Sequence, residues 1–203
     1  MTAGLAASVV HASAVVEPGA DIGPGTRIWH HVHVRAGAHV GRDCVLGKNV
    51  FVDTTAVIGD RVKVQNNVSV YAGVVLEDEV FVRPSAVFTN DRHPRAQSEA
   101  WEVSPTVVRR GASVGANATI VCGVELGTWS VVGAGAVVTC DVLPHELVVG
   151  NPARRSGWVC SCGRVVSRAD ELPDGTTCAD CGAAVPRPTD HTATSPDRRT
   201  RHA

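Results

Sequence analysis

An aliphatic residue recurs every six positions along most of this 203-residue chain, and that period limits the possible folds more than any other feature. A period of six fits neither the 3.6 residues per turn of an α-helix nor the two-residue alternation of a strand. It fits short strands joined by tight corners, where each side turns one aliphatic and one small side chain inward. The units from Val10 through Val82 read VHASAV, VEPGAD, IGPGTR, IWHHVH, VRAGAH, VGRDCV, LGKNVF, VDTTAV, IGDRVK, VQNNVS, VYAGVV, LEDEVF and VRPSAV.

The period is interrupted once and then resumes. Phe88 opens a further unit, and six more follow from Val108 (VRRGAS, VGANAT, IVCGVE, LGTWSV, VGAGAV and VTCDVL). Aromatic residues make up only 4% of a chain that is 44% hydrophobic, which suits a regular stack of small side chains. Because the ends of such a stack are open to further strand pairing, we expect caps before Val10 and from Pro144 onward.

These units resemble the repeats of the hexapeptide-repeat acyltransferases. The resemblance implies an all-β chain, a left-handed parallel β-helix with three six-residue sides per coil, and a trimer-forming acyltransferase. Some left-handed β-helices are not enzymes, so the repeat alone leaves the activity open.

Three sides per coil place residues 18 positions apart on the same side of the stack. The side that starts at Ile28 is followed by amide, imidazole and aromatic side chains in successive coils, whereas the side that starts at Val40 has ordinary charged residues. Amide and histidine ladders can be structural, but a polar ligand site or a subunit interface would explain why they gather on one side. The candidate substrate-binding residues in this region are His30, His33, Asn49, Gln65, Asn66, Asn67, Tyr71 and Arg83.

The interruption in the period runs from Thr89 to about Val107. A connection of this length without its own secondary structure is usually functional or disordered. This one has a compact polar cluster followed by Trp101, which favours a mobile but structured flap folded over a cleft. The cluster consists of Asn90, Asp91, Arg92, His93 and Arg95.

Longer stretches are similar to one branch of the family, which N-acetylates the 3-amino group of nucleotide-linked sugars. The similarity extends from about residue 8 to Trp158 and implies acetyl-CoA as co-substrate. It also implies acceptors such as UDP-linked 2-acetamido-3-amino-glucuronate or dTDP-linked 3-amino-6-deoxyhexoses. The stretches are IWHHVHV, LGKNVFV, VKVQNNVSVY, VFTNDRHPRA, GASVGANATIVCGV and VVGNPARRSGW.

The same resemblance implies roles in the reaction. Asn90, from the FTN motif, would lie at the reacting centre and orient the sugar amine. His93 departs from the commoner pattern TNxxNPRA and makes a general base available, so we hypothesise that Asn90 positions the amine while His93 is an optional base. Arg92 and Arg95, like Arg83, would pair with a uronate carboxylate or with the diphosphate.

The resemblance further implies a homotrimer with active sites between subunits, and acetyl-CoA in a groove beside the coils that follow the loop. By position, the residues along the pantetheine would be Asn117, Ala118, Ala134 and Gly135. Those near the phosphates or adenine would be Arg110, Arg154 and Arg155.

Four of the seven cysteines form two pairs near the C-terminus, and each pair is followed by glycine. Two such pairs predict a zinc site with four thiolate ligands. We expect this site to be structural, because four thiolates leave no open coordination position for a substrate. The first pair is CxC rather than the usual CxxC. The alternative is a pair of disulfides, which is disfavoured in a cytosolic protein. The ligands would be Cys160, Cys162, Cys178 and Cys181.

The expected organisation is a β-helix acyltransferase domain over residues 1–158 with its loop at 89–107, a zinc-knuckle or ribbon-like module over 159–185, and a disordered tail over 186–203. The formal net charge of −1 gives no electrostatic footprint for nucleic acid or an anionic membrane. The N-terminus has no basic n-region and no apolar stretch is long enough to span a bilayer, so we expect a cytoplasmic protein.

Two other functional classes remain open. One is a hexapeptide acyltransferase with another small acceptor, such as serine or an antibiotic. The other is a β-helix protein that is not an acyltransferase, either a scaffold or a carbonic-anhydrase-like enzyme. The cluster of His30, His31 and His33 supports the anhydrase. A catalytic zinc, however, normally needs three convergent ligands, each oriented by a hydrogen bond to a further group.

Overall fold

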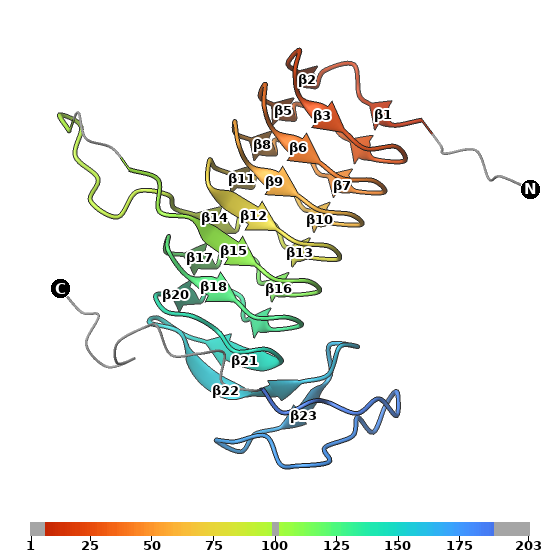
Figure 1. Cartoon of the computed structure of the whole chain (residues 1–203), viewed down its shortest axis with the longest axis vertical. Helices are drawn as coiled ribbons and strands as arrows, with labels where there is room; N and C mark the ends of the chain where they lie inside the picture. The colour runs from red at the N-terminus through yellow and green to blue at the C-terminus, as the bar shows by residue number, and fades with distance from the viewer. Residues whose placement is uncertain (1–6, 99–101, 189–203) are drawn as a thin grey trace, which may run out of the picture.

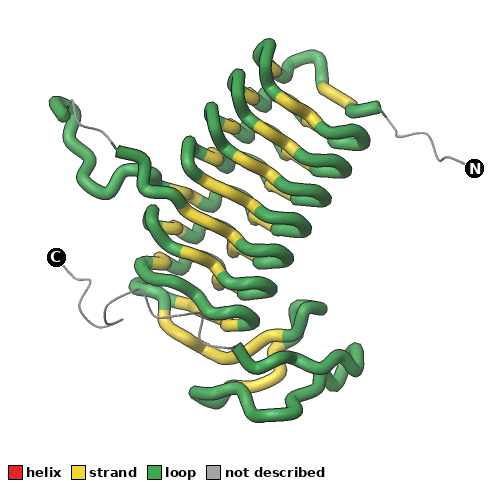
Figure 2. The backbone as a smooth tube through the Cα atoms, in the orientation of Figure 1, coloured by secondary structure: helices red, strands yellow, loops and turns green. Residues whose placement is uncertain are grey.

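The structure is a computed structural model that describes residues 7–98 and 102–188. Within these residues all regular elements are β-strands, which wind into a parallel β-helix with the shape of a three-sided prism (Figures 1 and 2). This part of the chain has no helix with the length and hydrophobicity needed to cross a membrane. The first residues of the expected N-terminal cap, Trp101 and nearly all of the expected disordered tail lie outside the described residues.

Three sheets form the sides of the prism. Sheet A consists of β1 (Val9–Val10), β4 (Arg27–Ile28), β7 (Val45–Leu46), β10 (Lys63–Val64), β13 (Phe81–Val82), β16 (Ser113–Val114), β19 (Val131–Val132), β21 (Glu146–Val149), β22 (Arg154–Val159) and β23 (Val165–Ser167). Sheet B consists of β2 (Val15–Val16), β5 (His33–Val34), β8 (Phe51–Val52), β11 (Ser69–Val70), β14 (Val87–Phe88), β17 (Thr119–Ile120) and β20 (Val137–Val138). Sheet C consists of β3 (Asp21–Ile22), β6 (His39–Val40), β9 (Val57–Ile58), β12 (Val74–Leu76), β15 (Thr106–Val108) and β18 (Glu125–Leu126).

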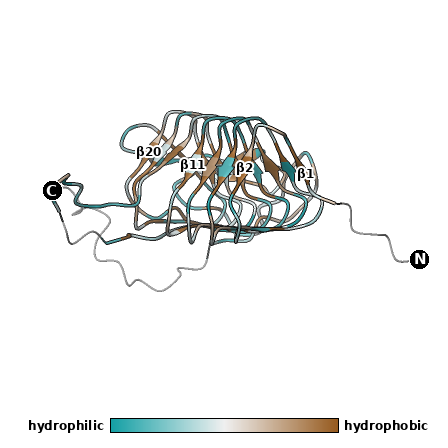
Figure 3. Ribbon diagram, turned by 90° about the horizontal axis from the view of Figure 1, so that it is seen from above, coloured by the Kyte–Doolittle hydropathy of each residue, from teal (hydrophilic) through white to brown (hydrophobic). Residues whose placement is uncertain are grey.

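The strand register confirms that residues 18 apart stack on one another. Leu46 pairs with Ile28 on one side and Val64 on the other, all in parallel strands. The aliphatic residue of each unit points inward, as does the small residue at its fifth position, for example Ala38 and Ala56, which are 1% and 0% exposed. Hydrophobic residues therefore follow the strands along the length of the prism (Figure 3). The predicted fold class is confirmed.

Three rows of corners join the sheets, and each row is an edge of the prism. The AB edge consists of residues 11–14, 29–32, 47–50, 65–68, 83–86, 115–118 and 133–136. The BC edge consists of residues 17–20, 35–38, 53–56, 71–73, 89–105 and 121–124. The CA edge consists of residues 23–26, 41–44, 59–62, 77–80, 109–112 and 127–130.

Corner geometry accounts for some of the polar residues on the AB edge. Asn49, Asn67 and Asn117 have φ angles of 59°, 61° and 55°, in the left-handed region that asparagine tolerates better than most residues. In addition, the Asn49 Nδ2 donates a hydrogen bond of 3.0 Å to the Asn67 Oδ1. These asparagines thus have a structural reason to be at the corners, whatever else they contact.

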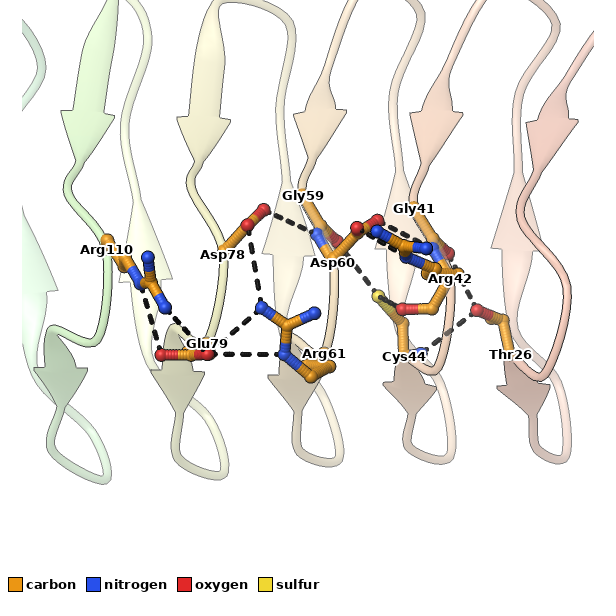
Figure 4. A network of polar contacts seen from close by, with 10 residues as sticks. All are labelled: Thr26, Gly41, Arg42, Cys44, Gly59, Asp60, Arg61, Asp78, Glu79 and Arg110. Atoms are coloured by element: carbon orange, nitrogen blue, oxygen red, sulfur yellow. Dashed lines mark hydrogen bonds and ion pairs between the residues drawn. The ribbon is translucent and has the colours of Figure 1, made fainter.

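The CA edge is the charged, solvated side that the sequence predicts. Arg61 and Arg110 both bind Glu79, with nitrogen–oxygen distances of 3.0 and 3.1 Å, and Arg42 binds Asp60 at 2.8 Å (Figure 4). Hydrogen bonds from Arg110 and Arg61 lower the pKa of Glu79. Ion pairs therefore link successive coils along this edge, and its arginines and carboxylates bind one another rather than a ligand.

Two boundaries differ slightly from the sequence predictions. The loop ends at residue 105 rather than 107, because Thr106 and Val107 already pair with Val74 and Val75. At the N-terminus, Val9 is part of the first coil, since it pairs with Arg27. At the other end β21 adds a last parallel rung to β19, and β22 covers that rung as an antiparallel strand. The expected C-terminal cap is therefore present.

Candidate functional site

A shallow pocket of about 290 Å³ lies where sheet A meets the AB edge. Three successive coils contribute to it, and three of the predicted substrate residues, His30, Gln65 and Asn66, lie together in its wall. Trp29 and Lys48 are not among the predicted substrate residues, although Lys48 precedes Asn66 by one coil repeat of 18 residues. The lining residues are Trp29, His30, Val45, Gly47, Lys48, Gln65 and Asn66.

Aromatic stacking organises the N-terminal end of this pocket. The rings of His11 and His30 stack with their centroids 3.6 Å apart, and the ring of Trp29 lies parallel to that of His30 at 6.4 Å. Partial burial lowers the pKa of His30, and the neighbouring His11, His31 and Lys48 lower it further. His30 is therefore a neutral hydrogen-bonding group at neutral pH, beside an aromatic surface that is 46% exposed at Trp29.

Amides form the opposite wall of the pocket. The Asn66 Oδ1 accepts a hydrogen bond of 2.9 Å from the backbone N–H of Lys48, so its NH₂ group is left as a donor. With the ammonium group of Lys48 and the Gln65 amide, the wall offers donors, an acceptor and a positive charge. Such a combination suits a polar, anionic ligand with a planar part.

The other predicted substrate residues are spread over neighbouring surfaces. His33 lies on the outer face of sheet B, where its Nε2 is 2.7 Å from the Glu17 Oε1. Tyr71 is on the BC edge, in edge-to-face contact with Phe51. The guanidinium group of Arg83 lies 5.5 Å from the ring centroid of Phe81. None of these three residues lines the pocket within one chain.

The base of the loop is hydrogen-bonded to the coil that follows it. The Asn90 carbonyl accepts a hydrogen bond of 3.0 Å from the Ser104 N–H, which closes the loop at its two ends. The Thr89 Oγ1 accepts one of 2.9 Å from the Cys122 N–H, and the Arg92 Nη2 donates one of 3.0 Å to the Cys122 carbonyl. These bonds hold Asn90 at a defined place, half-buried at the foot of the loop.

A glycine in the coil fits the returning part of the loop. A Cβ on Gly73 would lie 2.2 Å from the Val103 Cγ1, so only glycine leaves room for this contact. Further out, His93 is exposed and its backbone N–H donates to the Asp91 Oδ1 at 2.8 Å. Arg95 is also exposed, and its Nη1 donates to the Pro94 carbonyl.

The loop and the pocket lie on different edges of one chain. The loop projects from the BC edge between β14 and β15, on the left in Figure 1, whereas the pocket is beside the AB edge. Sheet B separates the two edges. The flap therefore does not cover the amide-rich pocket of its own chain.

Sheet B is the least charged side of the prism. Its outward column contains no Asp, Glu, Lys or Arg, whereas the corresponding columns of the other sheets include Arg27 and Lys63 in sheet A and Asp21 and Glu125 in sheet C. Val15 and Val87 are 55% and 46% exposed in this column. The full column is Val15, His33, Phe51, Ser69, Val87, Thr119 and Val137.

The predicted coenzyme residues divide between two edges. Asn117, Ala134 and Gly135 are exposed on the AB edge, in line with the pocket and towards the C-terminal end of the prism. Ala118 is on the same edge, but it is 0% exposed and its side chain belongs to the core. Arg110 is on the CA edge, where it is paired with Glu79.

The hairpin between β21 and β22 continues the AB edge beyond Gly135. Hydrogen bonds from the Val137 N–H to the Gly150 carbonyl (2.9 Å) and from the Ala153 N–H to the Val137 carbonyl (2.7 Å) fasten it there. Arg154 is exposed at the start of β22. The next residue, Arg155, instead faces the cap: its Nε donates to the Glu146 Oε1 at 2.7 Å, and its guanidinium group lies 4.7 Å from the Trp158 ring.

The four predicted metal ligands converge. Their sulfur atoms all lie within 4.8 Å of one another, with 3.6 Å between the Cys160 and Cys181 sulfurs and between the Cys162 and Cys178 sulfurs. A tetrahedral zinc–thiolate site with bonds of about 2.3 Å requires sulfurs roughly 3.8 Å apart. A disulfide requires about 2.05 Å, and all four cysteines are free. The cluster therefore fits a four-thiolate metal site rather than two disulfides.

Backbone amides support the thiolates as expected of such a site. N–H groups of Cys162, Arg164 and Ala183 donate to the sulfurs of Cys160, Cys162 and Cys181. Gly163 and Gly182 follow the pairs with φ angles of 86° and 72°, and their N–H groups donate to the carbonyls of Cys160 and Cys178. These positive φ angles explain why a glycine follows each pair.

The histidines do not form a comparable group. Among the described residues, the four cysteines are the only cluster of three or more His, Cys, Asp or Glu side chains with metal-binding geometry. His30 stacks on His11 and His33 pairs with Glu17, so the histidines in the described part of one chain do not converge on a point. The geometry of a single chain thus gives no support to the anhydrase alternative.

Comparisons with known proteins agree with this geometry. The family model for the hexapeptide repeat of succinyl-transferase matches residues 37–72 and 105–140. Over 153 residues the chain is 41% identical to dTDP-3-amino-3,6-dideoxy-alpha-D-galactopyranose 3-N-acetyltransferase of Aneurinibacillus thermoaerophilus, an alignment that covers 75% of this chain and 79% of that protein. The chain therefore belongs to the hexapeptide-repeat acetyltransferases, and the predicted family is confirmed.

Two further relatives show how widely the repeat is shared. Serine acetyltransferase 4 of Arabidopsis thaliana is 32% identical over 130 residues, which make up 63% of this chain but only 30% of that enzyme. Among solved structures, a hexapeptide-repeat-containing acetyltransferase of Vibrio cholerae, in complex with acetyl coenzyme A, superposes with a TM-score of 0.55 at 30% identity. That match covers 61% of this chain and 72% of the other.

Proposed function

We propose that this protein is an acetyl-CoA-dependent N-acetyltransferase that acetylates the 3-amino group of a dTDP- or UDP-linked amino sugar. The observation that most supports this is the 41% identity to the Aneurinibacillus enzyme over 79% of its length. The pocket on the AB edge is chemically suitable, because it offers an aromatic surface, amides and the positive charge of Lys48 to a nucleotide sugar.

The reaction makes modest demands on the protein. The neutral sugar amine attacks the thioester carbonyl, a C–N bond forms, the C–S bond breaks, and the proton released from nitrogen ends on the coenzyme thiol, a base or water. Such a step depends on alignment and on stabilisation of the developing oxyanion. We assign alignment of the amine to Asn90, whose backbone is held by Ser104, and an optional role as proton acceptor to the exposed His93.

A homotrimer would complete the site. Each strand of sheet B runs from the AB edge to the BC edge. If the uncharged sheet B faces a threefold axis, the BC edge of one subunit lies beside the AB edge of the next. The loop bearing Asn90, Arg92, His93 and Arg95 would then meet the pocket of its neighbour. This arrangement supports active sites between subunits, and it accounts for the separation of loop and pocket within one chain.

Acetyl-CoA would extend along the AB edge from the reacting centre towards the C-terminal end. The exposed Asn117, Ala134 and Gly135 would border the pantetheine, and Arg154 would reach the phosphates. Arg110 and Arg155 already have carboxylate partners within the chain, so Arg154 is the strongest of the three arginine candidates.

The metal that we propose for the cysteine cluster is a structural zinc ion, since its four sulfurs have the spacing of a closed tetrahedral site. When bound, zinc would crosslink the two cysteine pairs. Cysteines kept as thiolates also imply a reducing compartment, which supports a cytoplasmic location. The three parts of the chain would then be the β-helix domain (1–158), the zinc module (159–185) and the tail (186–203).

The test is the release of coenzyme thiol. Purified protein is mixed with acetyl-CoA and, in parallel, with dTDP-3-amino-3,6-dideoxyhexose, UDP-2-acetamido-3-amino-glucuronate or serine, and free thiol is followed with a chromogenic disulfide. We expect turnover with an amino sugar and none with serine. Turnover with serine alone would replace the proposed acceptor class, and no turnover with any acceptor would contradict the proposed activity.

The role of the loop is tested by two substitutions. We expect Asn90→Ala to lower kcat about 100-fold, since misplacement of a reacting group costs about that much, and His93→Ala to keep near-normal turnover. Ser98→Ala, in the exposed part of the same loop, is the control. The opposite ranking of Asn90→Ala and His93→Ala would show that His93 is required as a base and that the assignment to Asn90 is wrong.

A further inference from the structure

We propose that the four-cysteine module is a metal-dependent support for the coenzyme end of the AB edge, so that metal loading strengthens acetyl-CoA binding. The module is formed by residues 159–185, which begin at the last residue of β22 and contain all four cysteines. The proposal rests on the proposed function and on metal occupancy of the cluster. According to the proposal, the module affects the binding of acetyl-CoA but not that of the amino sugar. A module that only capped the end of the prism would affect the binding of neither substrate.

A single strand connects the metal site to the coenzyme edge. β22 starts at Arg154, next to the hairpin turn that Val137 holds in place, and ends at Val159, directly before the ligand Cys160. Along its length β22 pairs with β21 on one side and, near its end, with β23 on the other. Because β22 is one continuous strand, a displacement at the metal site would be transmitted along it towards the turn.

Side chains reinforce this connection between cap and module. Glu146, whose side chain is 4% exposed, accepts hydrogen bonds from the Leu143 N–H and from Arg155. Arg155 also donates to the Asp170 carbonyl, within the module, and lies against the Trp158 ring. The Glu146–Arg155 pair therefore ties the last turn of the prism to the module.

Trp158 lies where the two parts meet. It is 2% exposed and packs in a cluster with two of the ligands, Cys160 and Cys178, and with Leu172 and Val185. Leu143, from the end of the prism, packs against the same cluster. The indole N–H donates a hydrogen bond of 3.0 Å to the Ala169 carbonyl. The packing of this residue depends on the module being folded.

The module has too small an apolar core to fold without the metal. Apart from Trp158 and the thiols, Leu172 and Val185 are the only fully buried residues in its cluster, and β23 is its only strand among the described residues. Units of this size usually need a metal or disulfides, and the free energy of metal binding is then the free energy of folding. Metal loss would release β23, uncover Trp158 and loosen β22.

The consequence differs for the two substrates. The turn that precedes Arg154 is hydrogen-bonded to Val137, two residues beyond Gly135, at the proposed coenzyme end of the edge. The acceptor pocket is formed by the coils of β4, β7 and β10, in the N-terminal half of the prism. Loosening of β22 should therefore weaken acetyl-CoA binding, whereas the KM for the amino sugar and kcat should stay nearly unchanged.

The experiment compares the full-length protein with and without its metal. Zinc is removed with a chelator under reducing conditions, metal content is measured, and binding of CoA alone is followed by calorimetry. Hydrogen exchange is measured at β21 and β22. We expect the apo protein to bind CoA on the order of tenfold more weakly, with faster exchange in β22 and unchanged exchange in β7 and β10. Readdition of zinc should restore both.

Two variants distinguish the effect of the Glu146–Arg155 contact on CoA binding from the effect of the metal itself. Glu146→Gln weakens the tie to Arg155 and leaves all four cysteines in place, so it should bind zinc normally yet raise the KM for acetyl-CoA. Cys162→Ser removes an exposed ligand, and Cys140→Ser, outside the cluster, is its control. CoA affinity that is equal in the zinc-loaded and zinc-free proteins would overturn this inference alone. Failure of both forms to bind CoA would overturn it together with the proposed function.

Discussion

The prism and the four-cysteine module bury their interiors by different means. The prism encloses a continuous aliphatic column from Ile28 to Val148, in which each coil repeats the contacts of the previous one. The module buries little more than Leu172, Val185 and the Trp158 ring around its cysteines. The first part has many similar, weak and local contacts, whereas the second has one concentrated group of four thiols.

This difference predicts how the stability of each part should change when a single residue is substituted. In a stack of repeats, stability is approximately a sum of terms from each coil and its neighbours, so one lost contact lowers stability without abolishing the fold. In a small metal module the ligands act together, and loss of one removes most of the stabilisation. The predictions below test that contrast, from the largest expected effect to the smallest.

The largest effect should come from a buried metal ligand. Cys178→Ser removes a thiolate that is 2% exposed, and binding free energies of structural zinc sites are roughly 10–16 kcal/mol. We expect metal content to fall from about one ion per chain to near zero, with loss of the ordered Trp158 environment in near-UV circular dichroism. The β signal in the far UV should persist. Simultaneous loss of both signals would show that the prism depends on the module.

A core substitution in the prism should have the next largest effect. Phe88 is 1% exposed and is the largest side chain in the inward column of sheet B. We expect Phe88→Ala to lower the free energy of unfolding by about 3–5 kcal/mol, measured by denaturant titration, with zinc content unchanged. The control is Val9→Ala, at a position of sheet A that is 63% exposed, which should change stability by less than about 0.5 kcal/mol.

A corner of the AB edge should be less sensitive. Asn67→Ala places alanine at a φ of 61° and removes the hydrogen bond from Asn49. We expect a loss of about 1–2 kcal/mol in the free energy of unfolding. Asn67→Gly retains an easy left-handed backbone and should lose less. If the two variants are equally destabilised, the side-chain ladder matters more than the backbone conformation.

Substitution of Glu79 on the charged CA edge should have the smallest effect on stability, and this effect should appear as a change in Tm at acidic pH. Hydrogen bonds from Arg110 and Arg61 lower the pKa of Glu79 below the value of about 4.3 expected in an unfolded chain. The stabilisation is therefore fully present above that unfolded pKa and is lost as the pH falls through the lower, folded pKa. We expect the Tm to fall below about pH 4, and the fall to be smaller in Glu79→Gln. An identical pH profile for the variant would contradict this role.

Some features of the molecule follow from local sequence pattern alone. The six-residue period predicts the inward-facing residues, because each strand from β1 to β20 has only two or three residues and one aliphatic side chain must point inward on each side. The register of 18 follows, so Leu46 stacks on Ile28 as expected. The cysteine spacing similarly predicts the four-thiolate cluster. The predicted start of the loop, directly after Phe88, is also confirmed, because the six-residue period stops at that residue.

Other features required the three-dimensional structure. The sequence placed Asn49 and Asn67 among the ligand-binding residues, but their left-handed corners show a structural role that pattern alone does not separate from binding. Arg155 and Arg110 look alike as coenzyme candidates in the sequence, yet one is held by Glu146 and the other by Glu79. Residue type determines what a side chain can bind, while its neighbours determine whether it is free to do so.

By itself, the sequence determined the β-helix, its stacking register and the presence of a four-cysteine cluster, because these depend on contacts at fixed spacings along the chain. Only the tertiary structure decided that the loop stays clear of the pocket of its own chain, and that β22 joins the four-cysteine cluster to the hairpin at the end of the AB edge. Both facts depend on the path of segments that leave the six-residue pattern, and the repeat does not record that path.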